Sequence, residues 1–249
     1  MSEFWYTTGT MRAVRGASYQ AFSLFGPVHL FWLGLCALLS AVLGRWYHRA
    51  GEAARLRALR ILSALMLTDE VGKYVMTAST GQWEWGYLPL HLCSINIFIC
   101  LWHSIHPNRT AKEFLYALSL PGGLMALLSP TWTSLPMWNF MHLHSETIHI
   151  MLFLYPVLLL AGGFRPNWRT VPRLLAFLAC LAVPIYFLNK VLNTDFMFLN
   201  GTDGAAVNVF FARIFGDRLY MLGFLPLVLA LGLALYLPWG IAARRRKKS

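Results

Sequence analysis

The sequence is poor in charged residues: Asp, Glu, Lys and Arg together make up 12% of its 249 residues. Soluble globular domains carry about a quarter, so a water-soluble domain is excluded as the main part of the chain. Hydrophobic residues make up 57%, which is typical of several membrane-spanning segments. The expected fold class is therefore all-α, a single polytopic bundle of membrane-spanning helices.

Acidic residues and cysteines are also scarce. Only 10 Asp and Glu oppose 21 Lys and Arg, which gives a formal charge of +11. In a soluble protein this excess would suggest nucleic acid, but basic loops that orient a membrane protein explain it more simply, so no nucleic-acid partner is expected. The four cysteines lie in apolar runs without a Cys-x-x-Cys pair. We therefore expect neither disulfides nor a thiolate metal cage, and predict no metal and no cofactor.

Recognisable nucleotide-binding motifs and targeting segments are missing as well. We find no P-loop, no dinucleotide fingerprint and no internal repeat. The first 25 residues are polar and aromatic, without the early apolar core of a cleavable signal peptide. We divide the chain into a head segment (1–25), a transmembrane domain (26–241) and a basic tail (242–249).

The apolar stretches predict about seven spanning helices. Most Lys and Arg fall in every second loop and in the tail, and the positive-inside rule then places the N-terminus outside and the C-terminus in the cytoplasm of a plasma-membrane protein. The predicted spans are 26–44, 59–78, 87–105, 113–129, 139–163, 171–190 and 219–241.

Polar side chains interrupt several of these spans, which is costly in lipid unless they are paired or wetted. The topology and a helical rise of about 1.5 Å per residue place them in the outer half of the membrane. We expect His91, Lys73 and His144 to face a common water-accessible cavity. The polar residues counted in this site are His29, Glu70, Lys73, His91, His144, His149, Asn189 and Lys190.

Three segments carry a resemblance to a known family, namely Leu88–Cys93, Leu120–Pro130 and Trp138–His149, joined by Asn200 after Met197-Phe198-Leu199. They resemble the YwaF family of bacterial integral membrane proteins, from roughly residue 60 to the end of the last span. That family is distantly similar to a eukaryotic multi-pass lipid acyltransferase that uses a cysteine and a histidine. The resemblance implies acyl transfer on a membrane phospholipid or another acyl lipid. It places the eukaryotic cysteine at or near Leu90, so Cys93 is its neighbour and not its equivalent.

Two chemical routes remain open at this stage. In one, a histidine acts as general base toward an acceptor alcohol; in the other, the Cys93 thiol is the nucleophile and a histidine of 139–163 is its base. We favour the first, because Cys93 shares a helical face with Asn96 and Cys100. The candidate catalytic residues are His144, His149, His91 and Cys93, and the candidate substrate-binding residues are Lys73, Glu70, Asn189 and Asn200.

Two other functions compete with acyl transfer. A metal-dependent lipid hydrolase could use His142, Glu146 and His149, which fall at i, i+4 and i+7 on one helical face. The last predicted span has no histidine to complete such a set. A transporter or lipid-binding protein is favoured by the Pro121-Gly122-Gly123 break in the span 113–129, since broken helices line transport sites. We found no inverted repeat to support it.

Overall fold

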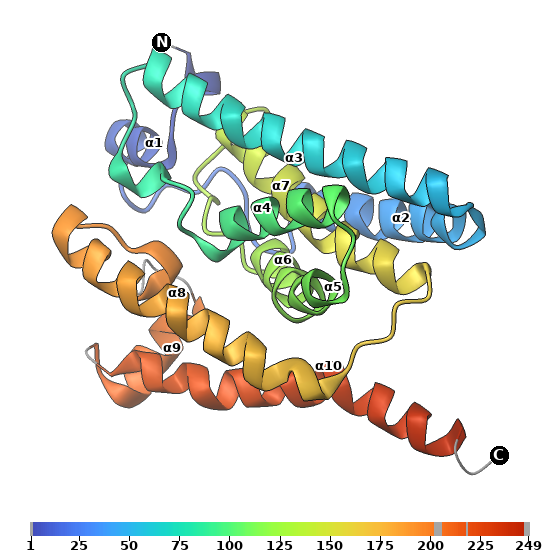
Figure 1. The fold of residues 1–249 in the computed structure, drawn as a ribbon. Helices are drawn as coiled ribbons and strands as arrows, with labels where there is room; N and C mark the ends of the chain where they lie inside the picture. Colours follow the sequence, from blue (N-terminus) through green and yellow to red (C-terminus); the bar gives the residue numbers. More distant parts are fainter. Residues whose placement is uncertain (1, 202–205, 218, 247–249) are drawn as a thin grey trace.

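The computed structural model describes residues 2–201, 206–217 and 219–246, and all regular structure in these ranges is helical. Figure 1 shows the arrangement. The 3-10 and π turns are labelled η, with η3 the π-helix. The elements are η1 (Glu3–Trp5), α1 (Thr8–Arg15), α2 (Pro27–Arg49), α3 (Glu52–Ser79), η2 (Trp85–Tyr87), α4 (Leu92–Ile105), α5 (Arg109–Phe114), η3 (Leu115–Ser119), α6 (Leu120–Leu128), α7 (Phe140–Ala161), η4 (Trp168–Thr170), α8 (Val171–Leu192), η5 (Phe196–Phe198), α9 (Ala206–Phe215), η6 (Tyr220–Gly223) and α10 (Phe224–Arg246).

Within the described residues, five helical segments are long and apolar enough to cross a membrane, whereas the sequence predicted seven. They confirm the predicted helices 26–44, 87–105, 139–163, 171–190 and 219–241 as α2, η2 with α4, α7, α8 and η6 with α10. The predicted span 59–78 lies within α3, whose 28 residues include too many charges to qualify. The predicted span 113–129 is divided among α5, η3 and α6.

The division of 113–129 has a local cause. Pro121 has no N–H to donate to the carbonyl of Ala117, so a regular α-helix would lose a hydrogen bond there. The chain widens just before it instead, and the N–H of Leu120 bonds to the carbonyl of Leu115, five residues back. Such π turns occur mostly as single interruptions in α-helices.

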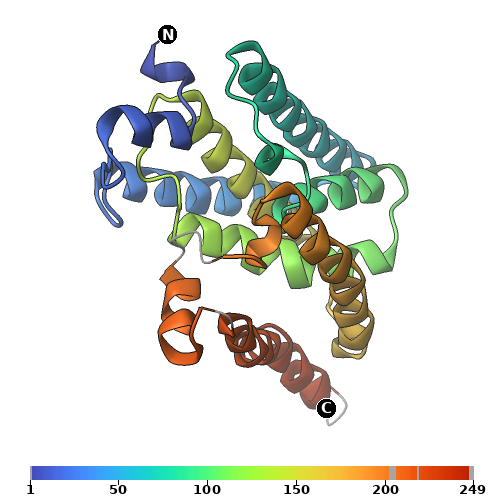
Figure 2. The same ribbon diagram turned by 90° about the vertical axis from the view of Figure 1, so that its left-hand side faces the viewer.

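Helix α7 lies at the centre of a bundle with α2, α3, α4 and α6 (Figure 1). Its contact with α6 is close because Gly123 has no side chain: a Cβ there would meet the His149 carbonyl oxygen and the Phe153 nitrogen at 3.0 Å. Helices α8 and α10 lie outside this bundle, on the side away from α3 (Figure 2). The structure therefore has a packed bundle and a more loosely attached helix pair.

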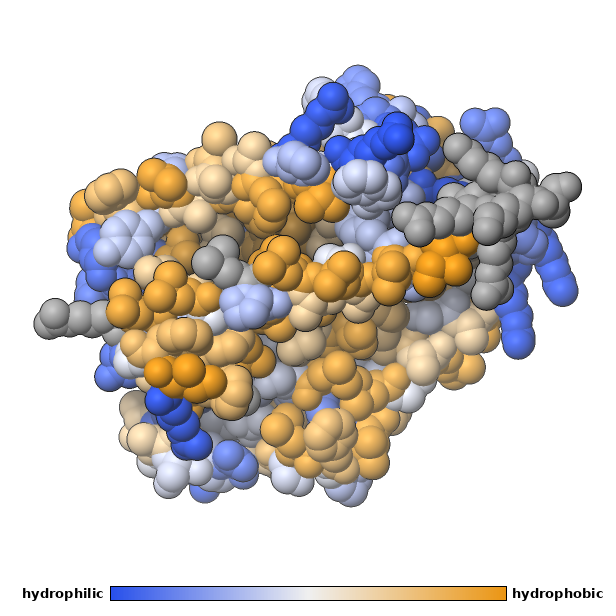
Figure 3. All heavy atoms as spheres, turned by 90° about the horizontal axis from the view of Figure 1, so that it is seen from below, coloured by the Kyte–Doolittle hydropathy of each residue, from blue (hydrophilic) through white to orange (hydrophobic). Residues whose placement is uncertain are grey.

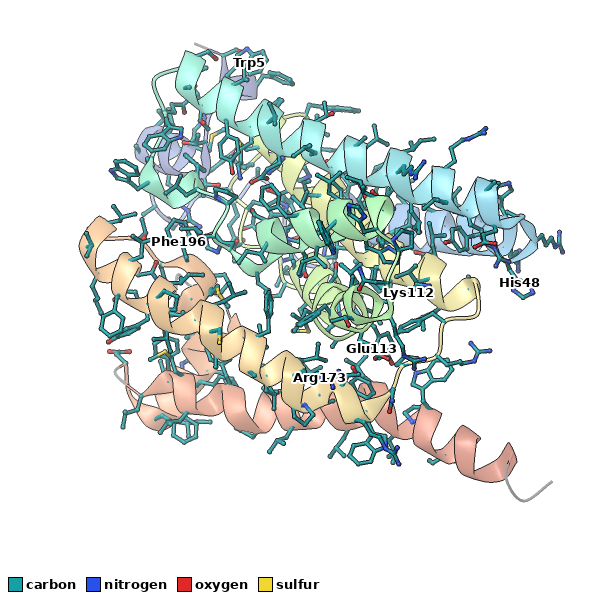
Figure 4. The ribbon with its side chains drawn as sticks, viewed as in Figure 1. Trp5, His48, Lys112, Glu113, Arg173 and Phe196 are labelled. Atoms are coloured by element: carbon teal, nitrogen blue, oxygen red, sulfur yellow. The ribbon has the colours of Figure 1, made fainter. Side chains whose placement is uncertain are left out.

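Two anchors fix the ends of the bundle. In the head segment, Met11 of α1 is fully buried, and the side chain of Thr10 bonds to Gln82 after α3 at 2.5 Å. At the opposite end, buried Glu113 accepts the backbone N–H of Asn167 with both carboxylate oxygens at 3.1 Å. Glu113 therefore fastens the linker between α7 and α8 to α5 (Figure 4). Of the predicted tail 242–249, α10 includes residues up to Arg246, and 247–249 lie outside the described residues.

Candidate functional site

A carboxylate–histidine pair joins α3 to α7. Asp69 Oδ1 lies 3.0 Å from His144 Nδ1, and Asp69 Oδ2 accepts a hydrogen bond from the Thr147 hydroxyl at 2.6 Å. His144 is 9% exposed. An Nδ1–H that donates to Asp69 leaves the lone pair of the imidazole on Nε2. The pair therefore has the arrangement of a general base that is held in one tautomer by a carboxylate.

Glu70 is the centre of the neighbouring network. Its Oε1 accepts hydrogen bonds from Lys73 Nζ at 2.6 Å, from the Tyr74 hydroxyl at 2.7 Å and from the Ser94 hydroxyl of α4 at 3.2 Å. Its Oε2 lies 3.8 Å from His144 Nε2. Glu70 and Lys73 are both buried, and an ion pair satisfies charges that would be costly alone in an apolar environment. This network brings the predicted residues Glu70, Lys73 and His144 together.

His149 and His142 belong to a separate cluster on the other side of α7. The His149 ring stacks on Trp132, with ring centroids 5.2 Å apart, and its Nδ1 lies 2.6 Å from the carbonyl oxygen of Ser145. Trp132 also donates from Nε1 to Glu146 at 3.0 Å. His142 Nδ1 bonds to a backbone carbonyl, and its Nε2 lies 3.8 Å from Glu146 Oε1. The two candidate catalytic histidines His144 and His149 therefore point to different neighbours.

The set His142, Glu146 and His149 was the candidate for metal binding. In the part of the chain that the structure describes, no group of three or more His, Cys, Asp and Glu side chains is placed to hold a metal ion. One ring nitrogen of His149 is already bonded to the backbone of its own helix. Helical spacing alone thus put these residues on one side of α7 without making their donor atoms converge.

His91 stands at the N-terminal end of α4, beneath η5. Its Nδ1 accepts the backbone N–H of Met197 at 3.4 Å, and its ring lies 5.3 Å from that of Phe196 and 6.0 Å from that of Phe198 (Figure 4). Met197 and Phe198 have φ of +58° and +56°, a left-handed conformation that is strained in residues other than glycine. Strain of this kind occurs where the surrounding structure imposes it, often at functional sites.

The predicted substrate-binding residues Asn189 and Asn200 fasten the turn that covers His91. Asn189 Oδ1 accepts the N–H of Phe196 at 2.9 Å, and its Nδ2 donates to the carbonyl of the same residue at 3.0 Å. Asn200 accepts from Lys190 Nζ, and its N–H donates to Asp195 at 2.6 Å. Both side chains are thus used in holding the segment between α8 and α9.

Two other predicted residues lie at the edge of the network. Cys93 is a free, half-buried thiol on α4, packed against the central hydrophobic cluster and directly before Ser94. His29 uses both ring nitrogens: Nδ1 accepts the N–H of Phe25 at 2.8 Å, and Nε2 lies 2.7 Å from the carbonyl of Leu127. With both nitrogens engaged, His29 links α2 to α6 and serves the fold.

Sequence reasoning missed several partners. Asp69 was considered only as half of an ion pair within its own helix, and Thr147, Ser94 and Tyr74 were not considered. The buried pair His103–Tyr155, with Nδ1 and the hydroxyl oxygen 2.9 Å apart, was missed as well. An acid in the apolar part of α3 was the available signal, since such a residue needs a partner on another helix.

Comparison with known proteins gives one informative result. The model of a family described as the TMEM164 family matches residues 24–236. No curated protein and no solved structure matches the chain. The matched range includes every helix of the central bundle and both the α3–α7 pair and the turn over His91.

Proposed function

The chain belongs to the TMEM164 family of multi-pass membrane proteins, and from this we propose that it is a lipid acyltransferase whose general base is His144. The observation that carries the proposal is the Asp69–His144 pair, held at 3.0 Å inside a helical bundle. A buried histidine with a carboxylate on Nδ1 is suited to take a proton at Nε2. The YwaF-like motifs around His91 and His144 support a role in acyl transfer.

The proposed reaction moves an acyl group between two alcohols. His144 Nε2 takes the proton of the acceptor hydroxyl, whose oxygen attacks the carbonyl carbon of the donor ester. The tetrahedral intermediate collapses, the bond to the departing alkoxide breaks, and that oxygen receives the proton from the imidazolium. Lys73 is the nearest cation, and it can stabilise the oxyanion once substrate competes for its bond to Glu70.

A seven-pass topology, with the N-terminus outside and the C-terminus in the cytoplasm of the plasma membrane, is part of this proposal. At about 1.5 Å per residue, the 28 residues of α3 exceed the thickness of a bilayer core. The charges that set α3 apart are paired inside the bundle: Asp69 with His144, and Glu70 with Lys73. A reporter fused after residue 86 should be extracytoplasmic, and a cytoplasmic reporter would refute this topology.

A transporter or lipid-binding protein is the second candidate. The interruption of 109–128 by η3 and Pro121 favours it, because non-helical turns at membrane depth occur where they are buried in protein or line a cavity. Both functions would place a lipid inside the protein. Only the first requires a proton acceptor at His144.

The test compares the lipids of four strains: a deletion strain, and the same strain complemented with wild type, His144→Ala or His106→Ala. His106 is an exposed histidine outside the bundle core and serves as the matched control. We expect wild type and His106→Ala to restore the same lipid species and His144→Ala to resemble the deletion. Full restoration by His144→Ala would rule out His144 as the base.

A further inference from the structure

A narrow apolar cavity separates the central bundle from the outer helix pair. Its volume is about 250 Å³, and its walls come from the start of α4, from η3 and α6, and from α8 and α10. None of its lining residues is charged; Leu92, Met125, Leu174 and Leu231 are examples from four different helices. A dry apolar cavity of even about 150 Å³ binds small apolar molecules. This cavity is therefore suited to a hydrocarbon ligand.

Two glycines keep the cavity open. Gly122 of α6 and Gly232 of α10 both line it, and a Cβ added to either would meet no heavy atom within 4 Å. Larger side chains at these positions would therefore project into empty space. The contrast with the neighbouring Gly123, whose added Cβ would meet backbone atoms at 3.0 Å, shows that the space is specific to this side of α6.

The cavity is continuous with the surface that faces lipid. Of its lining residues, Met125 is 37% exposed, Leu175 is 45% exposed and Val228 is 41% exposed. Figure 3 shows that the face over α10 is largely apolar. Because α8 and α10 are both spanning helices, the tails of membrane lipids surround this opening. Its occupant is thus an acyl chain, the apolar ligand present at that depth.

One end of the cavity lies beside the candidate site. Leu92, which lines the cavity, directly follows His91, the histidine covered by η5. A chain in the cavity would lead from the lipid-facing surface toward the start of α4. We propose that this cavity holds the acyl chain of the lipid substrate and leads it toward His91; the identity of the chain as substrate rests on the proposed function.

Shape must provide the selectivity of this site. A lipid tail that enters from the bilayer exchanges one apolar environment for another, so the hydrophobic effect contributes little. Packing against the walls is what remains, and packing is sensitive to an added side chain. Filling the cavity from Gly122 or Gly232 should therefore displace the chain without unfolding the helix, because leucine is a better helix former than glycine.

The experiment uses the full chain in vesicles of phosphatidylethanolamine and phosphatidylglycerol that contain a phospholipid with a diazirine in its acyl chain. After illumination, mass spectrometry maps the labelled residues. We expect labelling of Pro121–Met125 and Val228–Leu235, reduced at least about fivefold in Gly122→Leu and in Gly232→Leu. Gly240→Leu is the control, since Gly240 is also on α10 and open but does not line the cavity.

The outcomes separate this proposal from the proposed function, because labelling requires no turnover. Labelling that is unchanged in both cavity variants, or spread evenly over the lipid-facing surfaces of α2 and α8, would overturn the acyl-chain site even if wild type transfers acyl groups. Labelling that follows the expected pattern supports the site even if no acyl transfer is detected. In that second case the transferase proposal fails and the cavity remains a lipid-binding site.

Discussion

Helices α7 and α8 both have 22 residues, but the structure uses them in opposite ways. In α7, 56% of the apolar window is buried inside the protein, against 11% in the segment that contains α8. The more polar helix is the central one, since α7 carries three histidines and a glutamate, whereas the most apolar residues of α8 face outward. Lipid is as apolar as leucine, so burial in a membrane protein follows polar and close-packed residues. Sites of chemistry are therefore expected around α7.

The largest effect is expected at the pair that joins α7 to α3. Asp69→Asn should lower acyl transfer about 10²- to 10⁴-fold, because an amide can donate to Nδ1 and hold the wrong tautomer of His144. Steady-state rates with a labelled donor phospholipid in proteoliposomes measure it. Asn200→Asp, in the turn after α8, should leave the rate within a few-fold. Equal losses in the two variants would erase the functional contrast between the regions.

Removal of one member of the buried ion pair should mainly affect stability. Lys73→Met leaves the Glu70 carboxylate buried without its cation, and the cost should be about 3–5 kcal/mol. The double variant Glu70→Gln/Lys73→Met should recover much of that loss. Lys190→Met, an exposed lysine on α8, should cost about 0.5 kcal/mol or less. Unfolding free energies in detergent decide the matter, and a Lys73→Met protein as stable as wild type would contradict the inferred burial.

Glycine substitutions compare the packing of the two regions directly. Gly123→Ala should destabilise by about 1–3 kcal/mol, because its Cβ meets the backbone of α7 at 3.0 Å and the core has no room to relax. Gly232→Ala on α10 should be neutral or stabilise by up to about 1 kcal/mol, since its Cβ meets nothing and alanine favours the helix. Thermal unfolding of both proteins tests this. The reverse order of stabilities would show that α6 and α7 are not in close contact.

The smallest effect is expected at the cysteines. Cys93→Ala, in the bundle, and Cys180→Ala, exposed on α8, should both keep most of the transfer activity if His144 activates the acceptor directly. A thiol-reactive reagent should modify Cys180 faster than Cys93, because only Cys180 is exposed. Loss of activity in Cys93→Ala, with loss of labelling by a thiol-reactive acyl probe, would instead favour the covalent route.

The sequence predicted the class of protein and most of its long helices because both depend on composition and local order. A run of 22 apolar residues such as α7 must form its hydrogen bonds within itself in lipid, so length and hydropathy are enough to locate it. The count of spans was harder. Pro121 disrupts its helix through a missing N–H, and α3 carries charges whose partners lie far away in the chain.

What the sequence by itself determined is that His144, Glu70 and Lys73 would be costly in lipid and would need partners. Only the tertiary structure decided which partners they have. Asp69 and His144 are 75 residues apart, and His91 and Met197 are 106 apart, so their pairing depends on how each helix is rotated about its own axis. That rotation also turned His149 toward Trp132 and away from the α3–α7 pair. It is set by close packing between helices, such as Gly123 against α7, and no local pattern of residues encodes it.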